Sequence, residues 1–144
     1  MKYIGLDYGT KKCGLAVSDD RGMVAVPWKI VATSELLREL AEMLNNEKFK
    51  RIVVGESVNS KGEYNLVFAE VEKFVEILKN EYANKFKSGD LEIFFEKEFF
   101  SSKHARSGDG KHEVDDRAAA LILQRFLDKE NRGSAVEEVE EFDE

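Results

Sequence analysis

The N-terminal part of the chain alternates between short apolar runs and turn residues, a pattern typical of consecutive β-strands. The apolar runs cover residues 2–7, 13–18 and 23–31, and Gly, Asp and Lys residues separate them. Connections this short favour antiparallel pairing of neighbouring strands. Pro27 interrupts the third run. Because proline donates no backbone hydrogen bond, we expect this strand at a sheet edge or with a bulge at that point.

After residue 33 the apolar positions change to the 3.6-residue period of an α-helix. Helices are expected from a Ser34 N-cap to Leu44, over residues 67–82 and over residues 111–128. The short apolar runs 51–55 and 91–95 lie between them and are predicted to be parallel strands. The order βββαβαβα predicts an α/β fold with a mixed five-stranded sheet, its first three strands antiparallel, flanked by helices.

Composition limits the class of protein. The chain has 144 residues, 42 % hydrophobic and 35 % charged, with the single cysteine Cys13, which suits one domain without a disulfide or a cysteine-based zinc site. No stretch approaches the roughly 18 apolar residues of a membrane span. The first residues do not form a secretory signal. We therefore expect a cytoplasmic protein with no membrane partner.

The net charge of −7 is unevenly distributed along the chain. Residues 133–144 carry six acids and no basic residue, whereas the remaining chain has 22 basic and 23 acidic residues. A nearly neutral body is compatible with a nucleic-acid partner. Because runs of like charge are usually disordered, the sequence predicts a folded domain over residues 1–130 and a disordered acidic tail over residues 131–144.

Three carboxylates are expected to meet at one end of the predicted sheet. Asp7 ends the first strand and Glu98 follows the fifth, at the edge where open α/β sheets place their sites. Asp115 falls on the apolar side of the last helix, and that side faces the sheet. A buried carboxylate is costly unless it is paired or binds a metal.

Each acid alone also has an ordinary structural explanation. An Asp in the first turn of a helix interacts with the helix dipole, and an Asp after a strand often forms a turn. Three carboxylates together would repel one another unless they shared a cation. Oxygen ligands suit Mg²⁺ or Mn²⁺ better than Zn²⁺, so we expect a divalent-ion site at Asp7, Glu98 and Asp115.

Three longer motifs contain or adjoin these positions. They are GLDYGTKKCGLAVSD (residues 5–19), RIVVGESVNSKGE (51–63) and HEVDDRAAALILQRFLD (112–128). Their order and residues resemble those of the YqgF/RuvX family, small bacterial proteins of the ribonuclease H-like superfamily. The likeness covers residues 3–128. It implies a ribonuclease H-like fold with the order of elements that the pattern also predicts.

The resemblance implies a nuclease that hydrolyses phosphodiester bonds with one or two Mg²⁺ or Mn²⁺ ions. Its substrate would be the 5′ end of precursor 16S rRNA, in ribosome biogenesis, or a four-way (Holliday) DNA junction. The family's catalytic and metal-binding acids correspond to Asp7, Glu98 and Asp115. We expect a monomer or a homodimer, since junction cleavage requires two sites.

Phosphate contacts require polar and basic side chains close to the acids. The candidates that lie near them in sequence are Lys11, Lys12, Asn59, Lys103, Arg106 and Lys111. If several of these side chains contact phosphates, nucleic-acid binding should weaken with salt.

Two alternatives remain open. The family's usual Asp-Glu-Arg is Lys97-Glu98-Phe99 here, and an ammonium group beside Glu98 could occupy the place of a metal. That change favours a non-catalytic nucleic-acid-binding module of the same fold. Residues 7–11 also resemble the phosphate loop of actin-like and sugar-kinase-like ATPases, but those proteins bind nucleotide between two such domains, and this chain has room for one.

Overall fold

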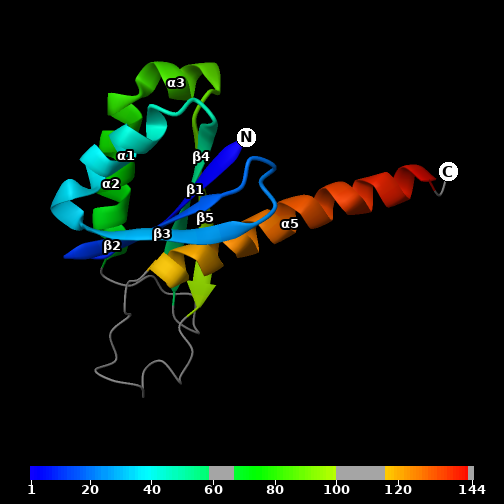
Figure 1. The fold of residues 1–144 in the computed structure, drawn as a ribbon, viewed down its shortest axis with the longest axis horizontal. Coiled ribbons are helices and arrows are strands. Elements are labelled where there is room, and N and C mark those ends of the chain that lie inside the picture. The colour runs from blue at the N-terminus through cyan, green and yellow to red at the C-terminus, as the bar shows by residue number, and fades with distance from the viewer. Residues whose placement is uncertain (59–66, 100–115, 143–144) are drawn as a thin grey trace.

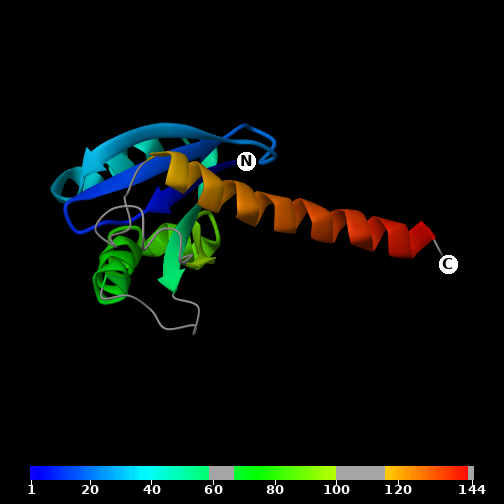
Figure 2. The ribbon, with the colours of Figure 1, turned by 90° about the horizontal axis from the view of Figure 1, so that it is seen from below.

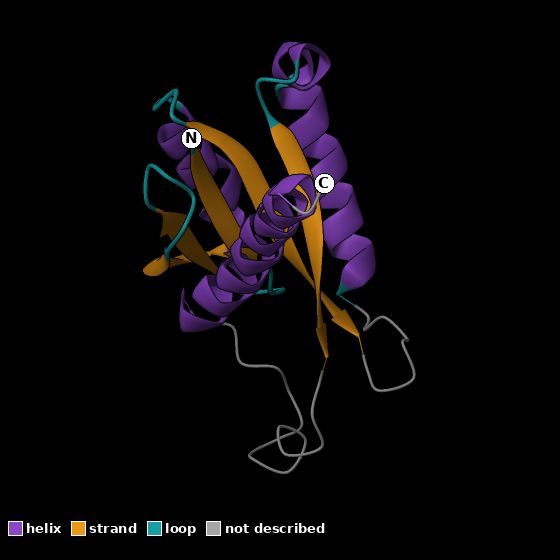
Figure 3. Cartoon of the chain, turned by 90° about the vertical axis from the view of Figure 1, so that its right-hand side faces the viewer, coloured by secondary structure: helices purple, strands orange, loops and turns teal. Residues whose placement is uncertain are grey.

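The computed structural model describes residues 1–58, 67–99 and 116–142, and it has the predicted α/β architecture (Figure 1). One mixed sheet has the strand order β3-β2-β1-β4-β5. Its strands are β1 (Lys2–Asp7), β2 (Lys12–Ser18), β3 (Ala25–Ala32), β4 (Phe49–Val58) and β5 (Glu92–Phe99). Helices lie on both sides of the sheet (Figure 3). They are α1 (Leu36–Leu44), α2 (Phe68–Glu81), α3 (Ala83–Ser88) and α5 (Asp116–Phe142).

The first three strands form the predicted antiparallel meander. Ile4 of β1 pairs with Val17 of β2, and β2 pairs in turn with β3. Asp19 forms the turn between β2 and β3, because its Oδ1 accepts hydrogen bonds from the backbone N–H groups of Met23 at 2.8 Å and Val24 at 3.1 Å. Side-chain acceptance of this kind is the usual reason for Asp in a turn.

Strand β3 lies at one edge of the sheet and contains a bulge at Pro27. Pro27 pairs with Ala16, and Lys29 pairs with Leu15, so Trp28 is an additional residue between the two pairs. Both expectations for this proline, an edge position and a bulge, are confirmed.

Strands β4 and β5 continue the sheet in parallel with β1. Leu6 pairs with Val54, and Val54 pairs with Phe95. Both strands extend beyond the apolar runs at residues 51–55 and 91–95, because the parallel ladder is formed by backbone groups and persists through polar residues. Glu98, predicted to follow the fifth strand, therefore lies inside β5.

The prediction that Ser34 caps α1 is wrong. Ser34 lies in the 3-10 turn η1 (Thr33–Glu35), the N-cap of α1 is Glu35, and no side-chain cap hydrogen bond forms there. The side-chain hydrogen bond at this point comes from Thr33, whose Oγ1 donates to the Gly9 carbonyl oxygen at 2.7 Å. This hydrogen bond attaches the residues just before α1 to the turn that follows β1. The start of the helix is therefore held in place without a capping serine.

Helix α5 covers the second face of the sheet and then extends beyond it (Figures 1 and 2). Gln124 attaches it to β3 and the turn before that strand, since its Oε1 accepts a hydrogen bond from Ala25 N at 2.8 Å and its Nε2 donates to Met23 O at 3.0 Å. The helix continues to Phe142, so residues 131–142 are helical where the acidic pattern predicts a disordered tail. Ala and Glu are strong helix formers, which favours this continuation.

Two apolar cores lie on opposite sides of the sheet. On the side of α1 and α2, Ile4, Leu6, Ile52 and Val54 are fully or almost fully buried. On the side of α5, the core is smaller and includes Tyr3, Ala16, Val53, Leu123 and Phe126. In the part of the chain that the structure describes, no helix combines the length and apolar character of a membrane span.

Candidate active site

Alternate residues of the three parallel strands face α5. In β1, Ile4 and Leu6 belong to the core under α1 and α2, so Asp7 faces the opposite side, toward α5. In β5, Phe94 packs against Phe126 of α5, with ring centroids 5.1 Å apart. The same alternation then directs Glu96 and Glu98 toward α5.

Asp7 is buried, with 3 % of its surface exposed, at the carboxyl end of β1. Its antiparallel partner is Gly14 of β2. On its other side lies Gly55, because the preceding residues Leu6 and Val54 are paired. Neither neighbour has a side chain, so backbone alone flanks the carboxylate within the sheet.

Glu98 lies on the same face as Asp7 and closer to the carboxyl edge. It pairs with Ser57, two residues beyond the pair of Gly55 and Glu96. Glu98 is partly buried, and its Oε2 atom is inaccessible to solvent. The structure therefore places Asp7 and Glu98 on one face of the sheet and near the carboxyl ends of their strands. The single strand β4 separates them.

Helix α5 begins near this edge and lies directly on the strands at two glycines. A Cβ atom at Gly5 would lie 2.9 Å from the Ala119 carbonyl oxygen, and one at Gly55 would lie 2.5 Å from Ile122 Cδ1. Asp116, the first residue of α5, is partly buried. Asp115, the third predicted acid, lies outside the described residues, so its role stays a prediction.

Comparison with known proteins identifies the family. A family model described as "RuvX: Holliday junction resolvase" matches residues 1–129. The chain belongs to the RuvX family. A RuvX relative from Sulfurihydrogenibium is 32 % identical, over 89 % of this chain and 90 % of the relative. Another from Lawsonia intracellularis is 35 % identical, over 90 % of this chain and 94 % of the relative. Both are named "Putative pre-16S rRNA nuclease".

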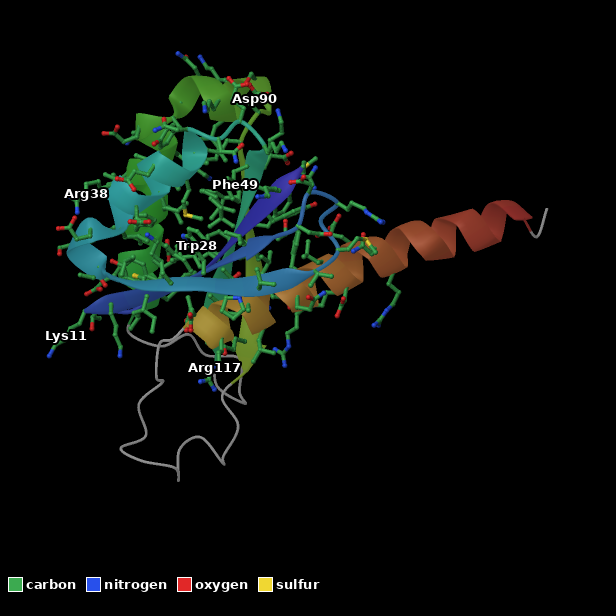
Figure 4. All side chains as sticks on the ribbon, viewed as in Figure 1. Lys11, Trp28, Arg38, Phe49, Asp90 and Arg117 are labelled. Carbon is green, nitrogen blue, oxygen red and sulfur yellow. The ribbon has the colours of Figure 1, made fainter. Side chains whose placement is uncertain are left out.

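Two of the predicted phosphate contacts of this RuvX chain are described. Lys11 and Lys12 are exposed, and Lys11 points into solvent (Figure 4). Lys12 lies two residues before Gly14 in β2 and therefore on the same face as Asp7, at the same edge of the sheet. The other four candidates, Asn59, Lys103, Arg106 and Lys111, lie outside the described residues.

Lys97 does not lie between Asp7 and Glu98. It is exposed, and as the residue next to Glu98 in a strand it faces the opposite side of the sheet. Its ammonium group is therefore directed away from Asp7. This geometry removes the observation that favoured a non-catalytic module.

Glu96 is an acid of this face that sequence reasoning missed. It is buried and forms an ion pair with Lys129 of α5, with Nζ 2.7 Å from Oε2. The available signal was its spacing of two residues from Glu98, which places both acids on one face of a strand. The apolar run that predicts this strand ends at residue 95, so Glu96 and Glu98 both fall outside the predicted strand.

The donors that the structure places fit a hard cation. Carboxylate oxygens such as those of Asp7 and Glu98 are the ligands that Mg²⁺ and Mn²⁺ prefer. Among residues 1–58, 67–99 and 116–142, no three His, Cys, Asp or Glu side chains form a group able to hold a metal ion. Asp115, the third predicted ligand, lies outside these residues.

The titratable groups on the opposite side of β1 and β2 have structural roles. Burial raises the pKa of the Cys13 thiol, and the nearby Asp7 charge acts in the same direction. Burial also raises the pKa of Tyr8, whose ring packs on Phe74 at 5.7 Å between centroids. A neutral, buried thiol is unreactive.

Proposed function

We propose that this chain is a metal-dependent endonuclease that processes the 5′ end of precursor 16S rRNA in the cytoplasm. The names of its RuvX relatives support this substrate. The observation that carries the proposal is the placement of Asp7 and Glu98 on one face and at one edge of the sheet. The carboxyl edge of parallel strands is where α/β proteins position their sites.

In this proposal Asp7, Glu98 and Asp115 hold one or two Mg²⁺ or Mn²⁺ ions. A bound dication supplies charge stabilisation for the attacking and leaving oxygens of phosphodiester hydrolysis. Asp7 is the central ligand, because its burial and the backbone on either side hold its carboxylate in one position. Lys11 and Lys12 bind backbone phosphates and orient the substrate at the edge of the sheet.

A four-way DNA junction is the second candidate substrate, because the matching family is described as a Holliday junction resolvase. Symmetric cutting of a junction requires two sites presented by a dimer. Sedimentation of the chain alone and with junction DNA would therefore separate the two substrates. A monomer that cuts only precursor RNA supports the first.

A cleavage assay with matched variants tests the catalytic proposal. Precursor 16S rRNA and junction DNA are incubated with wild type, Asp7→Asn and Glu98→Gln, with Mg²⁺ present or removed by a chelator. Asp7→Asn preserves side-chain shape but removes the charge, and we expect cleavage to fall by about 10²–10³-fold. Asp20→Asn is the control, since Asp20 is an exposed acid paired with Lys48.

Three results would contradict the proposal. They are cleavage that Asp7→Asn retains at the wild-type rate, cleavage that survives removal of the metal, and tight RNA binding with no cleavage under any condition. The last result would favour the alternative function, a non-catalytic nucleic-acid-binding module of the same fold. Thermal unfolding of each variant confirms that the comparison is made between folded proteins.

A further inference from the structure

An ion pair joins α5 to the sheet beside the proposed site. Lys129 Nζ lies 2.7 Å from Glu96 Oε2. The Lys129 side chain is 68 % exposed and the Glu96 side chain 6 % exposed, so a mostly solvated lysine reaches inward to a buried carboxylate. A long lysine stem allows this arrangement, because its methylene groups can lie along the protein surface while the ammonium group forms the contact.

Glu96 occupies the same row of the sheet as Asp7. Its parallel partner is Gly55, which lies beside Asp7 because Leu6 pairs with Val54. Two strand spacings separate the two acids, or about 10 Å between their Cα atoms. Glu98 follows two residues later on the same face. Glu96 is therefore close enough to influence both proposed ligands.

Strand β5 is an edge strand, and α5 supports it as it approaches Glu98. On the α5 side, Phe94 packs on Phe126, and Glu96 then bonds Lys129. On the opposite side Phe95 and Lys97 are exposed. The side chains of Phe94 and Glu96, which both face α5, therefore attach this part of β5 to the helix.

The pair also affects the charge near the site. Asp7, Glu96 and Glu98 are three carboxylates on one face, and like charges at short range disfavour one another. The ammonium group of Lys129 compensates the charge of Glu96. Asp7 and Glu98 then remain as the carboxylates directed to a dication.

We propose that the Lys129–Glu96 pair is a positioning device for the metal site, a role that rests on the proposed nuclease function. It holds the end of β5 so that Glu98 faces the site of Asp7. It also compensates the charge of Glu96 beside the two proposed ligands. Lys129 and Glu96 are positioning residues that act through Glu98, and neither contacts the substrate.

Three variants of the full chain test this role: Lys129→Met, Glu96→Gln and the double variant. Calorimetry measures Mn²⁺ binding, and steady-state cleavage of precursor RNA gives kcat and KM. We expect Lys129→Met to bind Mn²⁺ about threefold to tenfold more tightly, because Glu96 then lacks its compensating charge. We expect its kcat to fall about tenfold, since a small displacement of a ligand slows the reaction.

The other two variants should show different signs. Glu96→Gln leaves the positive charge of Lys129 without its counter-charge near the site, so we expect Mn²⁺ affinity to fall about threefold. The double variant removes both charges, so we expect its Mn²⁺ affinity to lie between those of the two single variants, whereas its kcat should stay low because the pair that holds the end of β5 is still absent. A purely structural role would instead leave metal affinity unchanged or lower it in all three variants.

Lys29→Met is the matched control. Lys29 pairs with Glu39 and joins β3 to α1, so its removal tests the loss of an ion pair away from the site. Wild-type metal affinity and kcat in Lys129→Met would overturn the proposal, as would a double variant whose Mn²⁺ affinity is no closer to that of wild type than the affinities of the single variants, or whose kcat equals that of wild type. Asp7→Asn separates the two proposals. If it cleaves like wild type, the nuclease function and the positioning role both fail, whereas inactive Asp7→Asn with unchanged Lys129→Met overturns only the positioning role.

Discussion

The two faces of the central sheet are formed by the same strands but differ in composition. The face under α1 and α2 is a continuous apolar core that includes Leu6 and Val54. The face under α5 carries Asp7, Glu96 and Glu98 near one edge, beyond a smaller apolar core. Leu6 and Asp7 are consecutive residues, yet they belong to different faces. Strand alternation thus lets one segment supply both the core and the candidate chemistry.

The faces also differ in how closely the helices approach the strands. Gly5 and Gly55 let α5 lie directly on β1 and β4. The same strands present larger side chains such as Ile4 and Ile52 toward α1 and α2. Substitutions on the α1 and α2 face should therefore change stability, whereas substitutions on the α5 face should also change the site.

Leu6→Ala should give the largest loss of stability. Leu6 is fully buried, and truncation of such a leucine leaves a cavity that costs about 2–5 kcal/mol. Denaturant unfolding measures this change. Cleavage per folded molecule should remain that of wild type, because Asp7 keeps its backbone position. A fall in specific activity as large as that of Asp7→Asn would show that the two faces are not separable.

Gly5→Ala should affect both stability and activity. The new Cβ would lie 2.8 Å from Leu123 Cβ and 2.9 Å from the Ala119 backbone oxygen. Backbone must move to relieve this contact, so we expect a cost of about 1–3 kcal/mol and a lower kcat as α5 shifts. Unfolding and cleavage measurements check the two effects.

Gly55→Ala is the matched comparison for Gly5→Ala. Its closest contact would be Ile122 Cδ1 at 2.5 Å, the end of a side chain that can change rotamer. We expect a smaller cost than for Gly5→Ala and nearly normal kcat. Equal losses in the two variants would show that the Ile122 side chain does not relieve the contact at Gly55.

The sequence predicts the place of Asp7 well, for a physical reason. Asp7 ends a short apolar strand, and both its burial and its edge position follow from alternation and from short-range turn signals. The antiparallel pairing of the first three strands is also accessible, since tight connections favour antiparallel neighbours. RuvX membership confirms the family that the longer motifs resemble.

Glu96 and Lys97 show what the sequence alone does not determine. Their roles depend on how far β5 continues beyond its apolar residues, and backbone pairing with β4 decides this. Pairing between residues distant in sequence leaves no local signal. The contact of Glu96 with Lys129 joins residues 33 positions apart, so it appears only once α5 lies on the sheet.

Asp19 provides the smallest predicted effect and a control outside both faces. Hydrogen bonds from the backbone N–H groups of Val24 and Met23 lower the pKa of its carboxyl group below the reference value of 3.8. A lowered folded-state pKa means that the carboxylate stabilises the fold above the unfolded pKa. This contribution is lost as the pH falls through the folded pKa.

Asp19→Asn should therefore lower stability slightly at neutral pH, because Asn presents one neutral acceptor oxygen in place of a carboxylate. The difference from wild type should shrink as the pH falls below about 4, where the carboxyl group becomes protonated. Thermal unfolding over a pH series measures both changes. Cleavage should be unchanged, since the turn lies between β2 and β3 at the end of β2 away from Lys12. A difference that grew on acidification would show that Asp19 does not act through its charge.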